Sequence, residues 1–249
     1  MILRAAACTD VGLRRRVNED RYALAPDLGL YLLADGMGGH SAGQVASQLA
    51  AEASLRAIET LQGGRVSPTE RLRHAVSCAN REIYSQAQSQ PELGGMGTTL
   101  VALLAADGRI ALAHVGDSRA YLIRRGRIRL LTDDHSLVGE LLRRREISED
   151  AAREHPHRHV LTRALGVRRN VEPDLAEMSP LAGDLFVMCS DGLTNHVRDD
   201  EIAARVREGV DLQESCDGLV ELANRRGGED NTTVVVVRYE KEDEEQTDV

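Results

Sequence analysis

Residues 98–131, TTLVALLAADGRIALAHVGDSRAYLIRRGRIRLL, decide the fold class. Apolar, strand-like runs fill this stretch with short turns between them, and the runs cover residues 98–105, 109–115, 119–124 and 127–131. The pairs Asp107-Gly108 and Arg125-Gly126 are typical of two-residue hairpin turns, which join antiparallel neighbours. This stretch therefore predicts an antiparallel sheet and not parallel strands joined by crossover helices.

Outward from this stretch, apolar strands and helical patterns continue in both directions. Further strand-like runs lie at 30–34, 185–190 and 232–237, and helical patterns lie at 41–61, 68–88, roughly 137–154 and 212–226. Gly227-Gly228 is a stop signal for the last of these helices. Groups of strands beside groups of helices predict an α+β fold in which helices cover antiparallel sheets.

The chain is expected to form a single domain followed by a short tail. Its 249 residues, 42% of them hydrophobic, are enough for one sizeable core, and no repeat or linker interrupts them before residue 240. Residues 240–249 carry six acids and one lysine, a composition typical of a solvated, disordered end. The predicted organisation is a domain over residues 1–239 and an acidic tail over residues 240–249.

Composition excludes several classes of function. Forty acidic and 31 basic residues give a formal charge of -9, which argues against nucleic acid as a partner. The single lysine, Lys241, lies near the end of the sequence, so neither a P-loop nor a kinase strand lysine is present. There is no apolar run of membrane-spanning length and no leader pattern, so a cytoplasmic protein without membrane contact is expected. Four scattered cysteines without a C-x-x-C pair predict reduced thiols.

Acidic residues recur where apolar runs meet turns, and six of them are of interest: Glu19, Asp20, Asp35, Asp117, Asp191 and Asp230. Each alone is typical of a turn or a helix cap. Together at one end of a sheet they would repel one another, so they must protonate, pair with cations or bind metal. Oxygen ligands without His or Cys favour Mg²⁺ or Mn²⁺. The pattern therefore indicates a metal-assisted hydrolase of a phosphate ester, in which two ions activate a bridging water.

The glycine-rich segment ADGMGGHSAG, residues 34–43, follows a strand and precedes a helix, as a dinucleotide-binding loop does. Its spacing does not fit, because the third glycine position of G-x-G-x-x-G is occupied by Ser41. We retain only the weaker interpretation that these glycines let the backbone approach a ligand closely.

Eight short motifs occur in the order found in one enzyme family: RRVNED (15–20), ADGMGGH (34–40), GMGTT (95–99), GDSR (116–119), LTDDHS (131–136), LTRALG (161–166), CSDGL (189–193) and EDN (229–231). Over residues 8–239 the sequence resembles the bacterial type 2C metal-dependent protein serine/threonine phosphatases (the PPM family). The resemblance implies a four-layer α-β-β-α sandwich, two antiparallel sheets flanked by helices, with a flap subdomain near residues 134–165.

The resemblance also implies a role for each candidate residue. The direct ligands of two Mn²⁺ or Mg²⁺ ions would be Asp20, Asp35, Asp191, Asp230 and the carbonyl of Gly36. Glu19 matches an acid that holds a metal-bound water, and Asp117 matches one that forms a third, looser site together with Asp191. Arg15 matches the phosphate-binding arginine, and its guanidinium is the bidentate donor that a phosphoryl group needs.

The implied reaction is one in-line displacement without a phosphoenzyme, in which a metal-bridging hydroxide attacks phosphorus. His40 is a candidate acid for the serine or threonine alkoxide that leaves. The alternative is a helix-start histidine without a catalytic role, because eukaryotic-type members carry the histidine directly after Asp-Gly, where this chain has Met37.

Two segments of the flap carry other candidates. The histidines of HPHRH (155–159) are interpreted as surface residues, with adventitious Zn²⁺ or Ni²⁺ binding as the alternative. The run Arg143-Arg144-Arg145 either attracts an acidic, phosphorylated substrate or forms a solvated helix face.

Two alternatives to a protein phosphatase remain open at this point. One is a catalytically inactive, phosphatase-like regulatory binding module, and the other is a phosphatase of a small phosphoester. The expected partners are phosphorylated proteins and a Ser/Thr protein kinase that shares its targets, and the expected state is a monomer.

Overall fold

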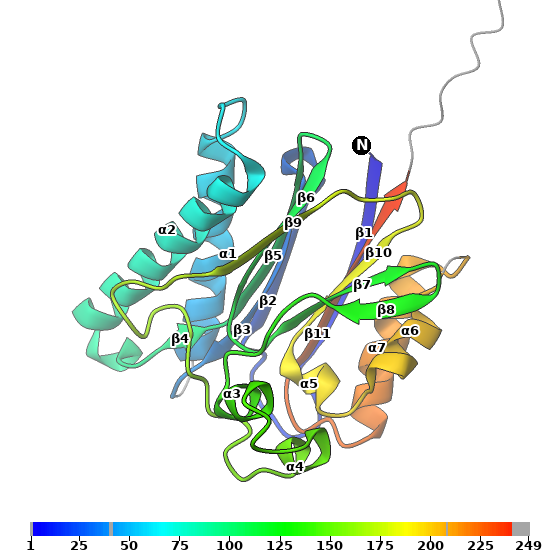
Figure 1. Cartoon of the computed structure of the whole chain (residues 1–249). Coiled ribbons are helices and arrows are strands. Elements are labelled where there is room, and N and C mark those ends of the chain that lie inside the picture. Colours follow the sequence, from blue (N-terminus) through cyan, green and yellow to red (C-terminus); the bar gives the residue numbers. More distant parts are fainter. Residues whose placement is uncertain (1, 40–41, 208, 241–249) are drawn as a thin grey trace, which may run out of the picture.

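Two antiparallel sheets lie face to face between two layers of helices in the computed structural model, which describes residues 2–39, 42–207 and 209–240 (Figure 1). One sheet has the strand order β1 (Ile2–Asp10), β11 (Thr232–Glu240), β10 (Leu185–Cys189), β7 (Arg119–Arg124) and β8 (Arg127–Leu130). The other has the order β2 (Asp20–Ala25), β3 (Leu30–Met37), β5 (Leu100–Ala106), β6 (Arg109–Val115) and β9 (Asp174–Met178), and β4 (Gly97–Thr98) pairs with β3.

The helices divide between the two outer faces. Long helices α1 (Ala42–Thr60) and α2 (Pro68–Ser89) cover the sheet that contains β3. Shorter helices cover the sheet that contains β11, and these are α5 (Asp191–Thr194), α6 (Asp199–Arg205) and α7 (Leu212–Arg225). Two single-turn 3-10 helices, η1 (Pro26–Leu28) and η2 (Pro91–Leu93), complete the layers. The predicted α-β-β-α sandwich is therefore confirmed. None of the helices in the described residues is long and apolar enough to cross a membrane.

The inner strands are apolar on both faces because each strand is covered on both sides. In β3, Leu30 and Leu32 pack against α1 and α2, whereas Tyr31 and Leu33 pack between the sheets. Both faces of strand β11 are covered in the same way. Val234 and Val236 face the α7 side, and Val235 and Val237 face the opposite sheet. This double burial explains why the sequence shows continuous apolar runs there instead of an alternation.

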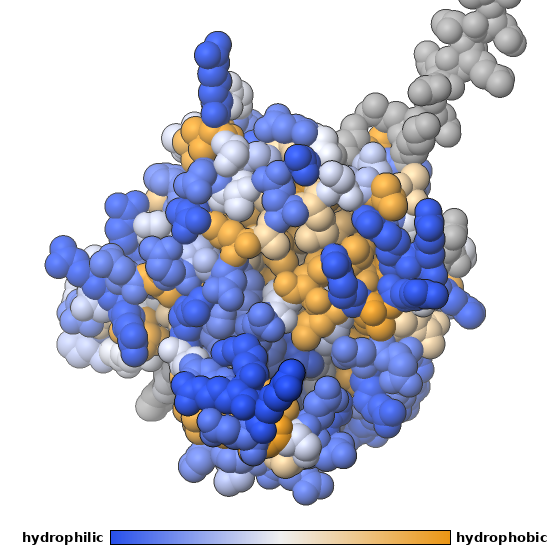
Figure 2. All heavy atoms as spheres, viewed as in Figure 1, coloured by the Kyte–Doolittle hydropathy of each residue, from blue (hydrophilic) through white to orange (hydrophobic). Residues whose placement is uncertain are grey.

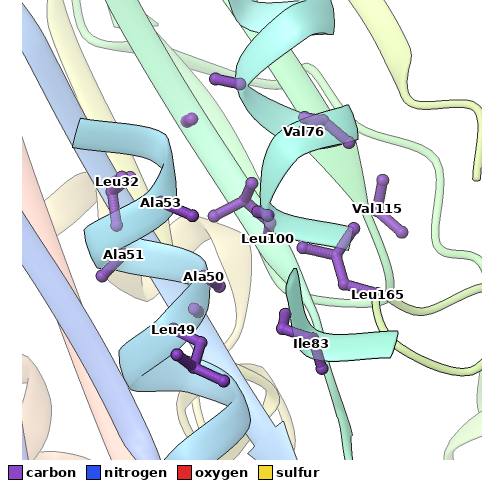
Figure 3. Packing of buried hydrophobic residues seen from close by; sticks show 14 of the residues in the cluster. Leu32, Leu49, Ala50, Ala51, Ala53, Val76, Ile83, Leu100, Val115 and Leu165 are labelled. Atoms are coloured by element: carbon purple, nitrogen blue, oxygen red, sulfur yellow. The ribbon is translucent and has the colours of Figure 1, made fainter. Parts of the chain in front are cut away.

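Small side chains let α1 lie close to its sheet. Ala46, Ala50 and Ala53 of α1 are buried, and Figure 3 shows Ala50 and Ala53 beside Leu32 and Leu100. At the start of α2, Ser67 accepts a hydrogen bond from the Glu70 amide, and Pro68 occupies the first turn. The predicted helices at 41–61, 68–88 and 212–226 thus match α1, α2 and α7 within two residues.

The hairpin turns also follow the prediction. Asp107, Gly108, Arg125 and Gly126 all have φ between 52° and 72°, the conformation that a tight two-residue hairpin turn requires. The strand expected over 30–34 is longer in the structure, because β3 continues to Met37. Gly36 and Met37 pair there with Thr98 and Gly97 of β4.

The flap between β8 and β9 differs from the prediction of one helix over 137–154. It contains two short helices, α3 (Leu137–Arg143) and α4 (Glu149–Arg153). Arg145 has φ +60°, which ends the first helix, and Ser148 caps the second by accepting a hydrogen bond from the Ala151 amide. The flap lies across one end of the sandwich (Figure 1), and its surface is mainly hydrophilic (Figure 2).

Candidate metal centre

The six candidate acids meet at the end of the sandwich beside the flap. Asp20 and Asp35 are register partners on β2 and β3, and Asp117 lies in the connection between β6 and β7. Asp191 is the first residue of α5, directly after the strand β10 and Ser190, and Asp230 precedes β11. A cleft of about 310 Å³ is lined by Arg15, Gly36 and five of these acids: Glu19, Asp35, Asp117, Asp191 and Asp230.

Asp20 lies behind the cleft, not on its wall, and only 1% of the residue is exposed. Its Oδ2 accepts hydrogen bonds from the hydroxyls of Ser190 (2.8 Å) and Thr233 (2.7 Å). Its Oδ1 is buried without a hydrogen-bond partner among the described atoms. Burial raises the pKa of Asp20 to about 6, although the two hydroxyls act in the opposite direction.

Glu19 carries a second buried oxygen without a described partner, Oε1. Burial raises the pKa of this carboxyl, and Arg15 and the amides of Gln44 and Gly43 at the start of α1 oppose that shift. Glycine is needed at positions 36 and 43, because a Cβ at Gly36 would clash with the backbones of Gly43 and Glu19. The glycines therefore bring β3 and the start of α1 into close approach around Glu19.

Two threonines fix the backbone of Asp35. The Asp35 amide donates to the hydroxyl of Thr99 (2.9 Å), and its carbonyl accepts from the hydroxyl of Thr98 (2.8 Å). The pKa of Asp35 and that of Asp117 both lie well above the ordinary value, first because the carboxyls are buried and second because neighbouring carboxylates repel their charge. The largest repulsion on Asp117 comes from Asp191.

Arg15 reaches the cleft and pairs with an acid. Its Nη2 donates to Asp230 Oδ2 over 2.7 Å, and about half of the Arg15 side chain is exposed. Burial raises the pKa of Asp230, and Asp191 adds to that shift while Arg15 opposes it. Asp191 in turn accepts a hydrogen bond from Asn195 Nδ2 at 3.2 Å. The cleft thus contains one arginine beside a row of carboxylates.

His40, the candidate acid, lies outside the described residues. Of the flap histidines, His159 lines the cleft, with Nδ1 3.8 Å from Asp191 Oδ2, and its side chain is 55% exposed. The surface interpretation of HPHRH therefore missed that one member of the run faces Asp191. The rings of His155 and His157 are 5.8 Å apart on the exposed side of the flap.

Three residues that the sequence did not mark as functional hold the acids in place. Asn231 accepts from the Glu19 amide (2.8 Å) and donates to the carbonyls of Val11 and Val17. Ser190 and Thr233 hold Asp20 as described above. One feature of the sequence could have pointed to these residues. Each is a polar residue directly beside a candidate acid or at the end of an apolar strand, as in the pair Asp230-Asn231.

These residues fit a site for hard divalent cations. Among the described side chains, no ion pair reaches Glu19, Asp20, Asp35 or Asp117, and two buried oxygens have no hydrogen-bond donor. Burial raises the pKa of Asp20, Asp35 and Asp117, and the neighbouring carboxylates raise it further, so a bound cation would favour their charged forms. An all-oxygen set of this kind suits Mg²⁺ or Mn²⁺, which would supply that charge.

A family model described as "Protein phosphatase 2C" matches residues 13–232. The chain belongs to the protein phosphatase 2C family. Among curated relatives in this family, the "Serine/threonine phosphatase stp" of Listeria monocytogenes is 41% identical over 236 residues, which are 92% of this chain and 93% of the relative. The "Serine/threonine protein phosphatase PstP" of Mycobacterium tuberculosis is 44% identical over 237 residues. That alignment covers 95% of this chain and 45% of the mycobacterial protein.

Solved structures of the protein phosphatase 2C family share the fold. The crystal structure of the M. tuberculosis phosphatase PstP/Ppp superposes with a TM-score of 0.89 and 42% identity, covering 97% of this chain and all of that one. The catalytic domain of PstP in complex with two manganese ions gives a TM-score of 0.87 with 41% identity, over 96% of this chain and 99% of the other. The resemblance stated from the motifs is thereby confirmed.

Proposed function

We propose that this protein hydrolyses phosphoserine and phosphothreonine in proteins with the help of divalent cations. The observation that carries the proposal is the cleft in which five carboxylates meet beside one half-exposed arginine, which pairs with Asp230 alone among them in the described residues. The family supports it, since the Listeria and mycobacterial relatives are named serine/threonine phosphatases and the catalytic domain of PstP holds two manganese ions.

In this proposal the acids fill three roles. Two Mn²⁺ or Mg²⁺ ions would be held by Asp20, Asp35, Asp191, Asp230 and the carbonyl of Gly36. Glu19 would hold a water of this centre, and Asp117 with Asp191 would form a third, looser site. When bound, the ions supply positive charge and an activated water as nucleophile, so no phosphoenzyme is needed.

The protein's own groups then bind and orient the substrate. Arg15 would take two phosphoryl oxygens with its planar guanidinium, and its bond to Asp230 holds that guanidinium at the mouth of the cleft. Ser190 and Thr233 fix the carboxylate of Asp20, and Asn231 fixes the backbone of Glu19. Because these bonds exist before substrate arrives, the site needs little reorganisation during the reaction.

The protonation of the leaving alkoxide stays assigned to His40 as a prediction. A comparison of His40→Ala with the wild type on a phosphopeptide and on an activated aryl phosphate tests it. An acid for the leaving group is needed by the peptide and not by the aryl phosphate. Equal losses on both substrates would contradict the role.

An inactive binding module would be expected to lack one or more of the six acids. All six are present around the cleft, which argues against that alternative. A small phosphoester as substrate remains the second alternative. The association with a Ser/Thr kinase, the monomeric state and the cytoplasmic location stay predictions. So does the division into a domain over 1–239 and a tail over 240–249. Strand β11 includes Glu240, and the rest of the predicted tail lies outside the described residues.

The decisive experiment measures phosphate release from phosphoserine, phosphothreonine and phosphotyrosine peptides with Mn²⁺, Mg²⁺ or EDTA. We expect release from the first two peptides that requires a divalent cation and nearly vanishes in Asp191→Asn. The matched control is Asp27→Asn, which changes an exposed aspartate in η1 and should retain full activity. Full activity in EDTA would contradict the metal requirement, and activity on small phosphoesters alone would favour the second alternative.

A further inference from the structure

His135 begins the flap with its side chain almost completely buried, at 3% exposure. Its main chain and its ring both contact Gly116. The His135 amide donates to the Gly116 carbonyl (2.7 Å), and the Gly116 amide donates back to Nδ1 of the ring (3.1 Å). Gly116 is the residue directly before Asp117. The flap is therefore joined to the turn that carries one of the cleft acids.

The other ring nitrogen of His135 faces the opposite direction. Its Nε2 lies 3.2 Å from Oδ2 of Asp174, the first residue of β9. Burial lowers the pKa of His135, although Asp174 opposes that shift, so the ring is neutral near pH 7. Since Nδ1 accepts a hydrogen bond, the one ring proton sits on Nε2, the nitrogen nearer the carboxylate. Nε2 makes no well-aligned hydrogen bond among the described atoms, so its contact with Asp174 is one of proximity.

Asp174 and the His135 backbone extend this connection to the far end of the flap. Oδ1 of Asp174 accepts from Nη1 of Arg163 over 2.6 Å. The Thr162 amide donates to the His135 carbonyl over 2.8 Å. The two ends of the flap, near residues 135 and 163, are thus fastened to each other and to the edge strand β9. We call His135, Gly116, Asp174 and Arg163 the flap clip.

We propose that His135 is a positioning residue that fixes the Gly116–Asp117 turn and thereby couples the flap to the carboxylate of Asp117. The proposal rests on the metal-binding role proposed above for Asp117. The turn is sensitive to such a contact. Gly116 has φ +113°, and a Cβ there would clash with Thr99. The turn therefore requires a conformation that glycine adopts readily and that leaves little room for movement.

A competing interpretation is a transition-metal site. His114 on β6 is 1% exposed, and neither of its ring nitrogens has a described hydrogen-bond partner. One ligand atom from each of His114, His135 and Asp174 lies within 4.8 Å of the others. A ligating histidine, however, donates a proton from its second ring nitrogen to an acceptor. In His135 that nitrogen accepts from Gly116, and Arg163 already pairs with Asp174, so the geometry favours the clip.

Two substitutions of His135 test the two contacts of its ring one at a time. The amide oxygen of His135→Asn stands near the position of Nδ1 and keeps an acceptor for Gly116. The longer His135→Gln reaches toward Asp174 and leaves the Gly116 amide unpaired. The matched control is Glu172→Gln, which removes a carboxylate two residues from Asp174 whose ion pair is with Arg73, outside the clip.

The experiment is a calorimetric titration of each metal-free protein with Mn²⁺, with melting temperatures as a check on folding. We expect His135→Gln to weaken the weakest Mn²⁺ site about tenfold, the size typical of losing a partner that orients a ligand. His135→Asn and Glu172→Gln should stay within about twofold of the wild type. Equal losses in both His135 variants, or none in either, would overturn the proposal. Wild-type protein that binds no Mn²⁺ would instead contradict the proposed function.

A second measurement on the wild type needs neither a variant nor a resident metal. Nitrogen-15 NMR of the histidine rings reports which nitrogen carries the proton. We expect His135 to have a bare Nδ1 and a protonated Nε2. A proton on Nδ1 would overturn the proposal, and so would stoichiometric Zn²⁺ uptake that shifts the ring signals of both His114 and His135.

Discussion

Two aspartates are buried equally, at 1% exposure, toward the two ends of strand β10, yet their surroundings differ. Asp184, just before the strand, accepts two bonds from Arg124 (2.8 and 2.6 Å) and one from the Leu181 amide. Asp20, beside Ser190 just after the strand, receives two hydroxyls, and one of its oxygens has no described donor. The first carboxylate is neutralised by the protein, whereas the second requires a proton or an added cation.

The comparison separates structural acids from functional ones. Burial alone does not distinguish them, and neither does a position at the end of a strand. An arginine partner separates Asp184 from Asp20, because a buried carboxylate without a cation is unstable in its charged form. Asp230 belongs to the cleft although it pairs with Arg15, since that arginine is half exposed. Among the described side chains, Glu19, Asp35 and Asp117 on the cleft wall and Asp20 behind it have no ion pair, in contrast to Asp184, which is why we assign the metal centre there.

The largest effect expected from this contrast is on catalysis. Asp35→Asn should lower phosphopeptide hydrolysis by at least about a thousandfold, or about 4 kcal/mol, because a divalent ion contributes several kcal/mol to such a reaction. Asp184→Asn should leave kcat/KM within about twofold of the wild type. Steady-state kinetics at saturating Mn²⁺ measures both. A similar loss in the two variants would remove the distinction.

The next effect is on stability, and here the substitution of Asp184 has the larger effect. Asp184→Asn should lower the free energy of unfolding by about 3 kcal/mol, since it leaves Arg124 without its buried partner. Asp20→Asn should cost nothing or stabilise the metal-free protein, because it removes an uncompensated charge. Urea unfolding in EDTA at pH 7 gives both values. Destabilisation by Asp20→Asn as large as that by Asp184→Asn would contradict the contrast.

A smaller effect follows from pH. The folded-state pKa of Asp20, about 6, lies above its ordinary value near 3.8, so the folded protein holds this proton more tightly than the unfolded chain does. The stability that Asp20 contributes is therefore complete below pH 3.8 and is lost as pH rises through 6. Metal-free protein should lose about 2 kcal/mol from this group between pH 4.5 and 7. Urea unfolding across this range measures the loss, and Asp20→Asn should reduce it. An unchanged slope in that variant would contradict the assignment.

The smallest effect concerns the one arginine of the cleft. Arg15→Lys keeps the charge beside Asp230 but loses the planar pair of donors that fits a phosphoryl group. We expect KM for a phosphopeptide to rise about tenfold, or about 1.4 kcal/mol, with Mn²⁺ affinity unchanged. Initial rates and Mn²⁺ titration test the two parts. A loss of Mn²⁺ affinity with constant KM would show that Arg15 orders Asp230 and does not bind phosphate.

Much of the fold could be predicted because its elements are determined locally. Strands β6 and β7 match the expected residues without error, since Gly-containing pairs fix the hairpin turns and the apolar runs fix the strands. The flap could not be predicted in the same way. Its residues 137–154 have a helical composition, but the left-handed Arg145 and the cap at Ser148 break them into two helices. Those interruptions leave no strong local signal.

The candidate acids could be listed from sequence, but their supports could not. Asp20 is held by Ser190 and Thr233, which are 170 and 213 residues away in the chain. The same is true of the flap clip, which joins residues of four separate segments. Such contacts depend on how the sheets pack and on which strand ends coincide, and no local pattern specifies that.

The most direct test of the account is the number of Mn²⁺ ions that the metal-free protein binds. Calorimetric titration should give at least two ions for the wild type and for Asp184→Asn, and fewer or much weaker ions for Asp35→Asn. Wild-type protein that binds no Mn²⁺, or an equal loss in Asp184→Asn and Asp35→Asn, would contradict the claim that the carboxylates gathered at the cleft form the metal centre.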